Sequence, residues 1–178
     1  MNVLALIFDG FEELEAIAPF ALIRRAGISL TIASKRTDVV GAHYIHLTDA
    51  MLLDEIDYRQ YDALLLPGGP HYRLIEAYAD VLEIIRYFME KEKVVCAICA
   101  APTILGRLGL LKNKNYTCFT SMNDEFGGHF FNQKVVVDGQ LITARSADAS
   151  ILFAYEIIRK LVGEEALRAV QKRIYYEE

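Results

Sequence analysis

The most informative segment of the chain is VVCAICAAPT, residues 94–103. Its first five residues form an unbroken apolar run, which is typical of a strand buried on both faces of a sheet. Two alanines and then Pro102 follow, and proline in the first turn is a signal for the start of a helix. Cys99 therefore falls at a predicted strand-to-helix turn, which is the layout of a nucleophile elbow.

A side chain at such a turn lies in the crevice at the carboxyl edge of a parallel sheet, where open α/β proteins bind ligands. The dipole of the following helix favours an anion there, so we expect a depressed pKa for the Cys99 thiol. The free N–H of Ala100 and its neighbours could hold an oxyanion. Cysteine is also among the commonest core residues, so an inert buried thiol is the alternative interpretation.

The rest of the chain alternates between strand-like and helix-like segments. Short apolar runs predict further strands at 3–8, 29–33 and 63–66, and helical patterns occupy 13–25, 79–91, 102–108 and 147–161. Two β-rich insertions are expected, at 42–47 and in a hairpin that joins 134–137 to 141–144 through the turn signal Asp138-Gly139. This alternation predicts a doubly wound α/β fold with a mostly parallel central sheet.

Composition restricts the class of protein. With 178 residues, 53% of them hydrophobic, and no Pro-, Gly- or Ser-rich interruption, the chain is expected to form one globular domain over residues 1–178. Its net charge is −5 and its Lys and Arg residues are scattered, so we expect no nucleic acid partner. Three cysteines without an export signal indicate reduced thiols rather than a disulfide framework.

No segment is suited to a membrane. The longest apolar run, 94–105, is too short for a span and contains Pro102. The N-terminal run 3–8 meets acidic residues at once, which is wrong for a secretory signal. We therefore expect a soluble, cytoplasmic protein with no membrane partner.

Cys96 and Cys99 have the C-x-x-C spacing that is found in dithiol redox sites. In such sites the first cysteine begins the helix, whereas Cys96 falls inside the predicted strand. We therefore reject a redox pair and assign Cys96, like Cys118, to the core.

A second candidate segment is DGFEELE, residues 9–15, which places three acids at the start of a predicted helix. Acids in that position normally complement the helix dipole, and we interpret Glu12 and Glu13 in this way. Glu15 differs because its helical phase puts it on or beside the apolar face. A carboxyl group so placed would be desolvated, with a raised pKa and a proton available for exchange. A purely structural Glu15 is the alternative.

Gly68 and Gly69 end the predicted strand at 63–66. Adjacent glycines permit positive φ and a close approach of the backbone to a ligand, so both are candidate substrate-binding positions, with the Gly69 N–H facing the crevice. The segment lacks the lysine and the length of a phosphate-binding loop. The alternative is a plain turn.

The chain has four histidines, each a candidate base or metal ligand. His129 follows two glycines, in a loop that could return to the crevice as a base for Cys99, although a surface position is the alternative. His43 and His46 would point to opposite faces of a strand and cannot form a simple chelate. His71 follows the glycine turn and is expected to be exposed. We predict no metal site.

Taken together, four motifs resemble the ThiJ/PfpI superfamily, in particular the DJ-one branch that includes the parkinsonism-associated deglycase and its bacterial relatives. The similarity extends over essentially the whole chain. It rests on GFEELE (10–15), RRAGI (24–28), YD (61–62) leading to LPGG (66–69), and AICAAP (97–102). The resemblance implies a flavodoxin-like three-layer sandwich, usually in a homodimer with the site near the interface.

The resemblance also implies roles for individual residues. Cys99 would be the reactive thiolate, with a protonated Glu15 hydrogen-bonded to it. The N–H groups of Gly69 and Ala100 would form an oxyanion-type pocket, and His129 would match the family histidine near the cysteine. No metal or organic cofactor is implied.

The implied activities fall into two classes. One is enzymatic: deglycation of thiols and amines modified by methylglyoxal or glyoxal, and glyoxalase activity without glutathione. The other is redox sensing or chaperone behaviour that uses the same cysteine, since oxidation also needs an accessible thiolate. The sequence leaves both open.

Three positions depart from the family pattern. Ala100 stands where the protease-like branch has a histidine, so a peptidase is not supported. Ala42 stands where relatives often carry an arginine that lines the site, which leaves substrate preference open. Asp148 occupies a loop that is usually rich in glycine and proline. We interpret Asp148 as an ordinary acid at a helix start rather than a neighbour of the thiolate.

Overall fold

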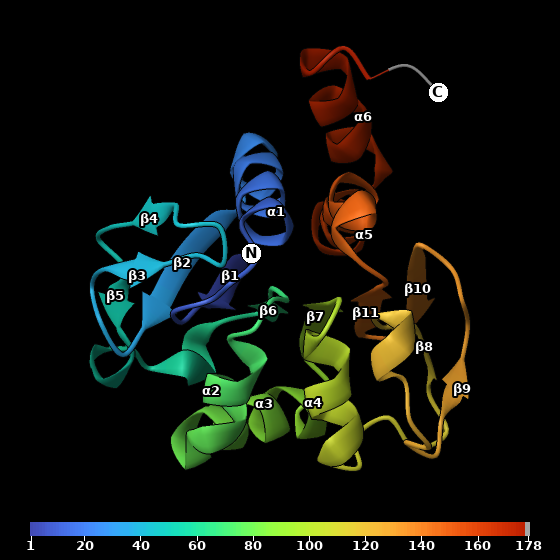
Figure 1. Ribbon diagram of the computed structural model, residues 1–178. Helices are drawn as coiled ribbons and strands as arrows, with labels where there is room; N and C mark the ends of the chain where they lie inside the picture. Colours follow the sequence, from blue (N-terminus) through green and yellow to red (C-terminus); the bar gives the residue numbers. More distant parts are fainter. Residues whose placement is uncertain (177–178) are drawn as a thin grey trace.

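The computed structural model describes residues 1–176, which form a central seven-stranded sheet in the order β10-β11-β7-β6-β1-β2-β5 (Figure 1). Neighbouring strands are parallel except for β10, which runs antiparallel to β11. The strands of this sheet are β1 (Asn2–Leu6), β2 (Ser29–Ser34), β5 (Met51–Leu52), β6 (Ala63–Leu66), β7 (Val94–Ile98), β10 (Val135–Asp138) and β11 (Leu141–Ala144).

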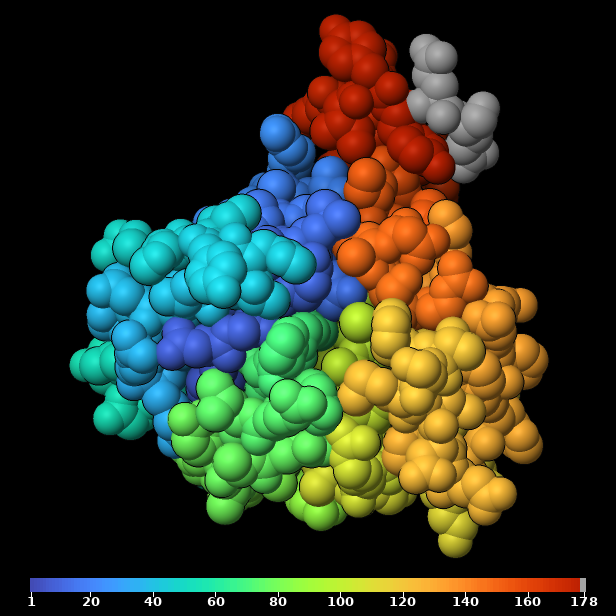
Figure 2. Space-filling view, in the orientation of Figure 1, coloured from blue at the N-terminus to red at the C-terminus, as the bar shows by residue number. Residues whose placement is uncertain are grey.

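Helices cover both faces of the sheet (Figure 1). One side carries α1 (Glu13–Arg25) and α5 (Ser150–Val162), and the other carries α2 (Tyr72–Ala77), α3 (Ala79–Glu90) and α4 (Ala101–Arg107). The last helix, α6 (Glu164–Arg173), packs on α5 and projects from the body of the molecule (Figure 2). This three-layer α/β arrangement is flavodoxin-like and confirms the predicted fold class.

The central strands divide their side chains between two separate hydrophobic clusters. In β1, Val3 and Ala5 pack on the side of α1 and α5, whereas Leu4 and Leu6 pack on the side of α3 and α4. All four are fully buried. Successive residues of a strand point to opposite faces, so burial on both faces requires the continuous apolar runs that the sequence contains.

The predicted hairpin is present but is not an insertion. Its second strand, β11, lies parallel to β7 and extends the main sheet, with Ala144 beside Ile98. The Asp138-Gly139 turn joins its two strands as predicted. A separate small parallel pair, β8 (Asn115–Tyr116) with β9 (His129–Phe130), lies next to this hairpin, where β8 contacts β10 and β11.

The predicted strand at 42–47 is wrong. The structure has instead a hairpin of β3 (Val39–Val40) and β4 (His46–Leu47), with a tight turn between them. In that turn the backbone N–H groups of His43 and Ile45 donate to the carboxylate of Glu13 rather than to another strand. A side-chain acceptor thus replaces the ladder that a strand would need.

Three neighbouring strands, β7, β6 and β1, end at the same edge of the sheet. Their carboxyl ends lead into the segments that the sequence singled out, at Cys99, at Gly68-Gly69 and at Asp9–Glu15 respectively. Among the described residues, no helix has the length and apolar character needed to cross a membrane.

Candidate functional site

Cys99 lies at the turn between β7 and α4, as predicted. Its φ is +64°, in the left-handed region that residues with a side chain rarely adopt. Two backbone bonds hold it there: its N–H donates to Ala144 O at 2.9 Å, and its carbonyl accepts from the Phe119 N–H at 2.8 Å. The cost of this conformation is about 1–3 kcal/mol, and the surrounding chain must offset it.

Glu15 lies beside Cys99. Although it is in the first turn of α1, it is only 1% exposed, as its helical phase predicted. Gly68 is what allows the two side chains to approach. A Cβ on Gly68 would lie 2.2 Å from Glu15 Oε2 and 2.6 Å from Cys99 Cβ. The structure therefore brings Glu15, Gly68 and Cys99 together at the carboxyl edge of the sheet.

Burial raises the pKa of Glu15 from 4.5 to about 7. The Cys99 thiol and the Gly68 backbone lower this pKa by smaller amounts, and the charge of Glu12 raises it. Glu15 Oε2 is buried and has no well-formed hydrogen bond within the described chain. The predicted desolvation of Glu15 is thus confirmed, and its carboxyl group can exchange a proton near neutral pH.

The predicted depression of the Cys99 pKa is wrong for this arrangement. Burial of the thiol raises its pKa, and the charge of the Glu15 carboxylate raises it further. The Ala100 N–H acts in the predicted direction and lowers it, but this effect is smaller. Two adjacent buried acids cannot both ionise at low cost, so Cys99 and Glu15 titrate as a pair that shares a proton.

The two glycines of the β6 turn differ in role. Gly68 touches the acidic pair, as described above. Gly69 has φ +99°, and a Cβ there would lie 2.5 Å from the backbone N of Glu12, so it permits the turns after β6 and β1 to pack closely. The oxyanion role of the Gly69 N–H stays a prediction.

The role of His129 as a base for Cys99 stays a prediction. His129 lies on β9 with its side chain exposed, and its N–H donates to Lys114 O at 2.8 Å. The described chain contains no hydrogen bond or ion pair between His129 and Cys99. The loop that carries His129 closes by pairing its backbone with β8.

His71 was expected to be exposed and is instead fully buried. Its Nδ1 accepts the Phe8 N–H at 3.2 Å, and its Nε2 lies 2.8 Å from Pro67 O. These partners require a neutral ring with the proton on Nε2. Burial accordingly lowers the pKa of His71 from 6.5 to about 4. His71 thereby ties the end of β1 to the turn that carries Gly68, a positioning role that sequence reasoning missed.

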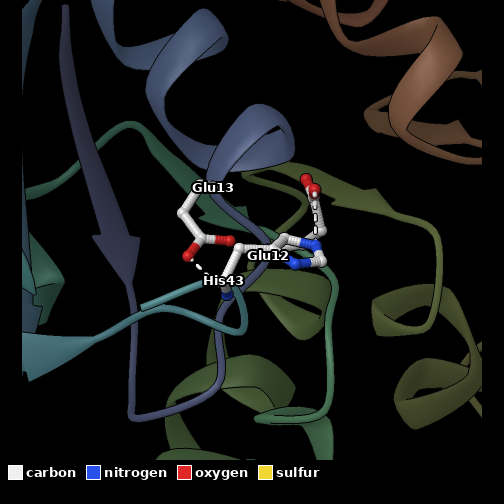
Figure 3. Close-up of side chains that lie close together, drawn as sticks. All are labelled: Glu12, Glu13 and His43. Atoms are coloured by element: carbon white, nitrogen blue, oxygen red, sulfur yellow. Dashed lines mark hydrogen bonds and ion pairs between the residues drawn. The ribbon is translucent and has the colours of Figure 1, made fainter. Parts of the chain in front are cut away.

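Glu12 and Glu13 were both interpreted as acids that complement the helix dipole. Glu12 fits, because it caps α1 by accepting the Glu15 N–H at 2.7 Å. Glu13 does not fit, because it is only 5% exposed and anchors the turn that contains His43 (Figure 3). Its carboxylate needs Gly41 beside it, since a Cβ there would lie 2.2 Å from Glu13 Oε1.

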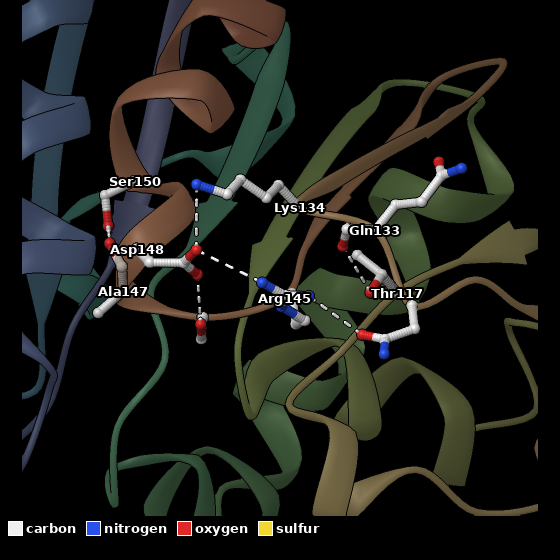
Figure 4. Close-up of polar contacts among 9 residues, drawn as sticks. Thr117, Gln133, Lys134, Arg145, Ala147, Asp148 and Ser150 are labelled. Atoms are coloured by element: carbon white, nitrogen blue, oxygen red, sulfur yellow. Dashed lines mark hydrogen bonds and ion pairs between the residues drawn. The ribbon is translucent and has the colours of Figure 1, made fainter.

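Asp148 lies in a short 3-10 turn just before α5, which agrees with its interpretation as an acid at a helix start. Figure 4 shows it in a polar cluster with Lys134 and Arg145, at 3.2 and 3.4 Å. The Ser146 hydroxyl donates to it at 2.7 Å. These partners lower the pKa of Asp148, the Ser146 hydrogen bond most of all.

Comparison with known proteins shows the family to which the chain is similar. Residues 1–160 match the sequence profile of the DJ-1/PfpI family. A deglycase of Thermococcus kodakarensis is 32% identical over 165 residues, which cover 90% of this chain and 99% of that protein. Protein DJ-1 homolog B of Arabidopsis thaliana is 34% identical over 171 residues, which cover 92% of this chain but 39% of that longer protein.

Among solved structures, DJ-1beta of Drosophila melanogaster is similar over nearly its whole length. The TM-score is 0.92 at 28% identity, with 99% of this chain and 98% of that chain covered. The family profile covers most of the chain, and the fold is that of a solved DJ-1 protein. The chain therefore belongs to the DJ-1/PfpI family.

Proposed function

We propose that this protein is a cysteine-dependent deglycase or glyoxalase-type enzyme, which acts on methylglyoxal or glyoxal and on their adducts with thiols and amines. The observation that carries the proposal is the buried Glu15 carboxyl group beside Cys99 on a left-handed turn. The name of the Thermococcus kodakarensis relative, a deglycase, supports it.

The first step forms a covalent bond to the substrate. The Cys99 thiolate adds to the aldehyde carbon, and the carbonyl π electrons become an oxyanion on the resulting hemithioacetal. We assign the N–H groups of Ala100 and Gly69 to this oxyanion. Because its surroundings raise the pKa of the Cys99 thiol, the reacting form is the one in which the shared proton has moved from Cys99 to Glu15, where it stays while the thiolate attacks.

The second step moves a proton between neighbouring carbons. Glu15 first gives its proton to the oxyanion and becomes a carboxylate. It then removes the proton from the carbon that bears the sulfur, which forms an enediol, and delivers that proton to the adjacent carbon. The product is a thioester on Cys99. Water then breaks the C–S bond, releases lactate from methylglyoxal or glycolate from glyoxal, and returns a proton to the pair. The net change is addition of one water, so no oxidant or reductant is consumed. His129 takes no part in these steps.

The proposal is tested by lactate formation from methylglyoxal in buffer that contains EDTA. We expect Cys99→Ala to fall to background and Glu15→Gln to lose about 10²–10⁴-fold in turnover, the usual contribution of a positioned acid or base. Cys118→Ala is the matched control, because Cys118 is a buried thiol outside the site, and it should keep wild-type turnover. Turnover that survives Cys99→Ala would refute the mechanism, and wild-type turnover at background would favour the redox-sensing alternative.

We further propose that two copies of the chain associate through α1 and act in the cytoplasm. Leu14 and Ile17 of α1 are 53% and 42% exposed, and a self-complementary apolar face is typical of two-fold dimers. Sedimentation equilibrium measures the mass directly, and a monomer at micromolar concentration would contradict the dimer.

A further inference from the structure

The β3–β4 turn and the first turn of α1 bring together three side chains that could bind a metal. Figure 3 shows Glu12, Glu13 and His43 at this junction. One ligand atom from each, two carboxylate oxygens and a ring nitrogen, lies within 4.8 Å of the others. Glu12 and Glu13 are adjacent, whereas His43 lies 30 residues further along the chain and is held beside them by its N–H, which donates to Glu13 Oε1 at 2.7 Å.

Glu13 contributes a carboxylate oxygen that accepts no hydrogen bond from the described residues. Its side chain is buried, and its Oε1 accepts the N–H groups of His43 and Ile45. Its Oε2 is also buried and has no hydrogen-bond partner among the described residues. In Figure 3 this second oxygen faces the side of His43 and Glu12. A buried carboxylate oxygen without a partner is unfavourable, and such atoms commonly mark a bound ion or water.

Glu12 and His43 provide the other two ligands from the solvent side. Glu12 Oε2 accepts the Glu15 N–H, which leaves Oε1 free. His43 Nε2 lies 3.8 Å from that Oε1, too far for a hydrogen bond. Two ligands of one tetrahedral Zn²⁺ lie about 3.4 Å apart, given metal–ligand distances near 2.1 Å. The three ligand atoms lie within 4.8 Å of one another, so the side chains must come closer to bind one ion, and the His43 ring, which is 72% exposed, is free to move.

We propose that Glu12, Glu13 and His43 bind a divalent transition-metal ion such as Zn²⁺, with water or another small ligand at the fourth position. Imidazole favours transition metals over Mg²⁺ or Ca²⁺, which prefer all-oxygen sites. The site uses no sulfur and is separate from the Cys99 thiol. The sequence predicted no metal site because it placed His43 and His46 on one strand, whereas the turn directs His43 to α1.

The test is calorimetric titration of ZnCl₂ into the full-length, chelator-treated protein. We expect one site per chain in the wild type, and at least a tenfold weaker Kd in both His43→Ala and Glu12→Gln. His46→Ala is the matched control, because His46 is an exposed histidine on the same hairpin, and it should keep the wild-type Kd within about twofold.

Cys99→Ser separates this site from the thiol. Retention of the wild-type Kd in Cys99→Ser, together with its loss in His43→Ala, supports the proposal. Zn²⁺ binding that disappears in Cys99→Ser and is unchanged in His43→Ala would overturn it, as would a wild-type protein that binds no Zn²⁺ below millimolar concentration. Each readout is independent of turnover, so the proposed enzyme and the proposed metal site can fail separately.

Discussion

At the scale of single residues, the site depends on a missing side chain. Gly68 lies against both Glu15 and Cys99, and the space there holds no side chain. A Cβ on Gly68 would lie 2.2 Å from the Glu15 carboxylate. Ile98 O would also be only 2.8 Å away. The proton-sharing pair therefore exists because one backbone position lacks a side chain, and the residue that matters most to its geometry has no chemistry of its own.

We expect Gly68→Ala to push Glu15 away from Cys99 and to cost about 1–3 kcal/mol of unfolding free energy, which is usual for overpacking. Urea unfolding measures the cost, and the rate of Cys99 alkylation by iodoacetamide reports the altered pair. Gly139→Ala is the control, because its Cβ would meet open space, although its φ of +59° costs about 1 kcal/mol. Alkylation of Gly68→Ala at the wild-type rate would show that the close contact is unimportant.

At the scale of elements, β7 and α4 meet at a turn that no residue with a side chain adopts easily. The turn is imposed from outside, by the bonds of Cys99 to Ala144 and to Phe119. Function at this position requires sulfur, whereas the backbone would favour glycine. Stability and function therefore oppose each other at Cys99.

This opposition predicts an unusual order of stabilities. Replacing Ala97 by glycine inside β7 should destabilise the protein by about 0.5–1 kcal/mol or more, the ordinary effect of glycine in a strand. At the elbow we expect the reverse, with Cys99→Gly at least as stable as Cys99→Ala, because glycine relieves the left-handed φ. Urea denaturation of the three variants decides this. The turn would be unstrained if glycine were as harmful at 99 as at 97.

At the scale of the whole molecule, His71 links global stability to pH. The folded chain keeps it neutral, with a pKa of about 4 against 6.5 for an exposed histidine. Between these values the unfolded chain binds a proton that the folded chain does not. The contribution of His71 is therefore complete above pH 6.5 and is lost as pH falls towards 4, by about 3 kcal/mol in total.

The unfolding free energy, measured in urea at pH 7.5 and at pH 4.5, should fall by a smaller amount in His71→Asn than in the wild type. The variant will be less stable at pH 7.5, because the Phe8 N–H and Pro67 O lose their partner. Carboxylates that titrate below pH 5 affect both proteins alike, so the difference isolates His71. Identical pH dependence in the two proteins would mean that the ring is not held neutral.

Much of this arrangement could be predicted from the sequence, because it rests on local patterns. Apolar runs gave the strands, the small residues and Pro102 after Cys99 gave the elbow, and helical phase gave the burial of Glu15. The burial of two other polar residues, Glu13 and His71, could not be predicted. Each accepts a hydrogen bond from a backbone N–H of a segment distant in sequence. Every residue except proline has such an N–H, so the sequence contains no pattern that identifies the partner.

The remaining errors have the same origin. The raised pKa of Cys99 follows from burial and from its distance to Glu15, whereas the sequence revealed only the helix dipole that acts in the opposite direction. The glycines before His129 likewise did not indicate that its backbone N–H pairs with Lys114 O. These features depend on contacts between segments that are distant in sequence, and composition and periodicity do not reveal such contacts.

The bond from Cys99 to Ala144 also bears on how the protein is made. Ala144 ends β11, the strand that pairs with β7 but comes late in the chain, well after the segments that carry Glu15, Gly68 and Cys99. During synthesis, the elbow cannot acquire this support until β11 has left the ribosome. An interrupted chain that stops before the β10–β11 hairpin would contain the thiol and its acid but not the bond that helps to hold the strained turn. Assembly of the reactive site is thus reserved for a nearly finished molecule.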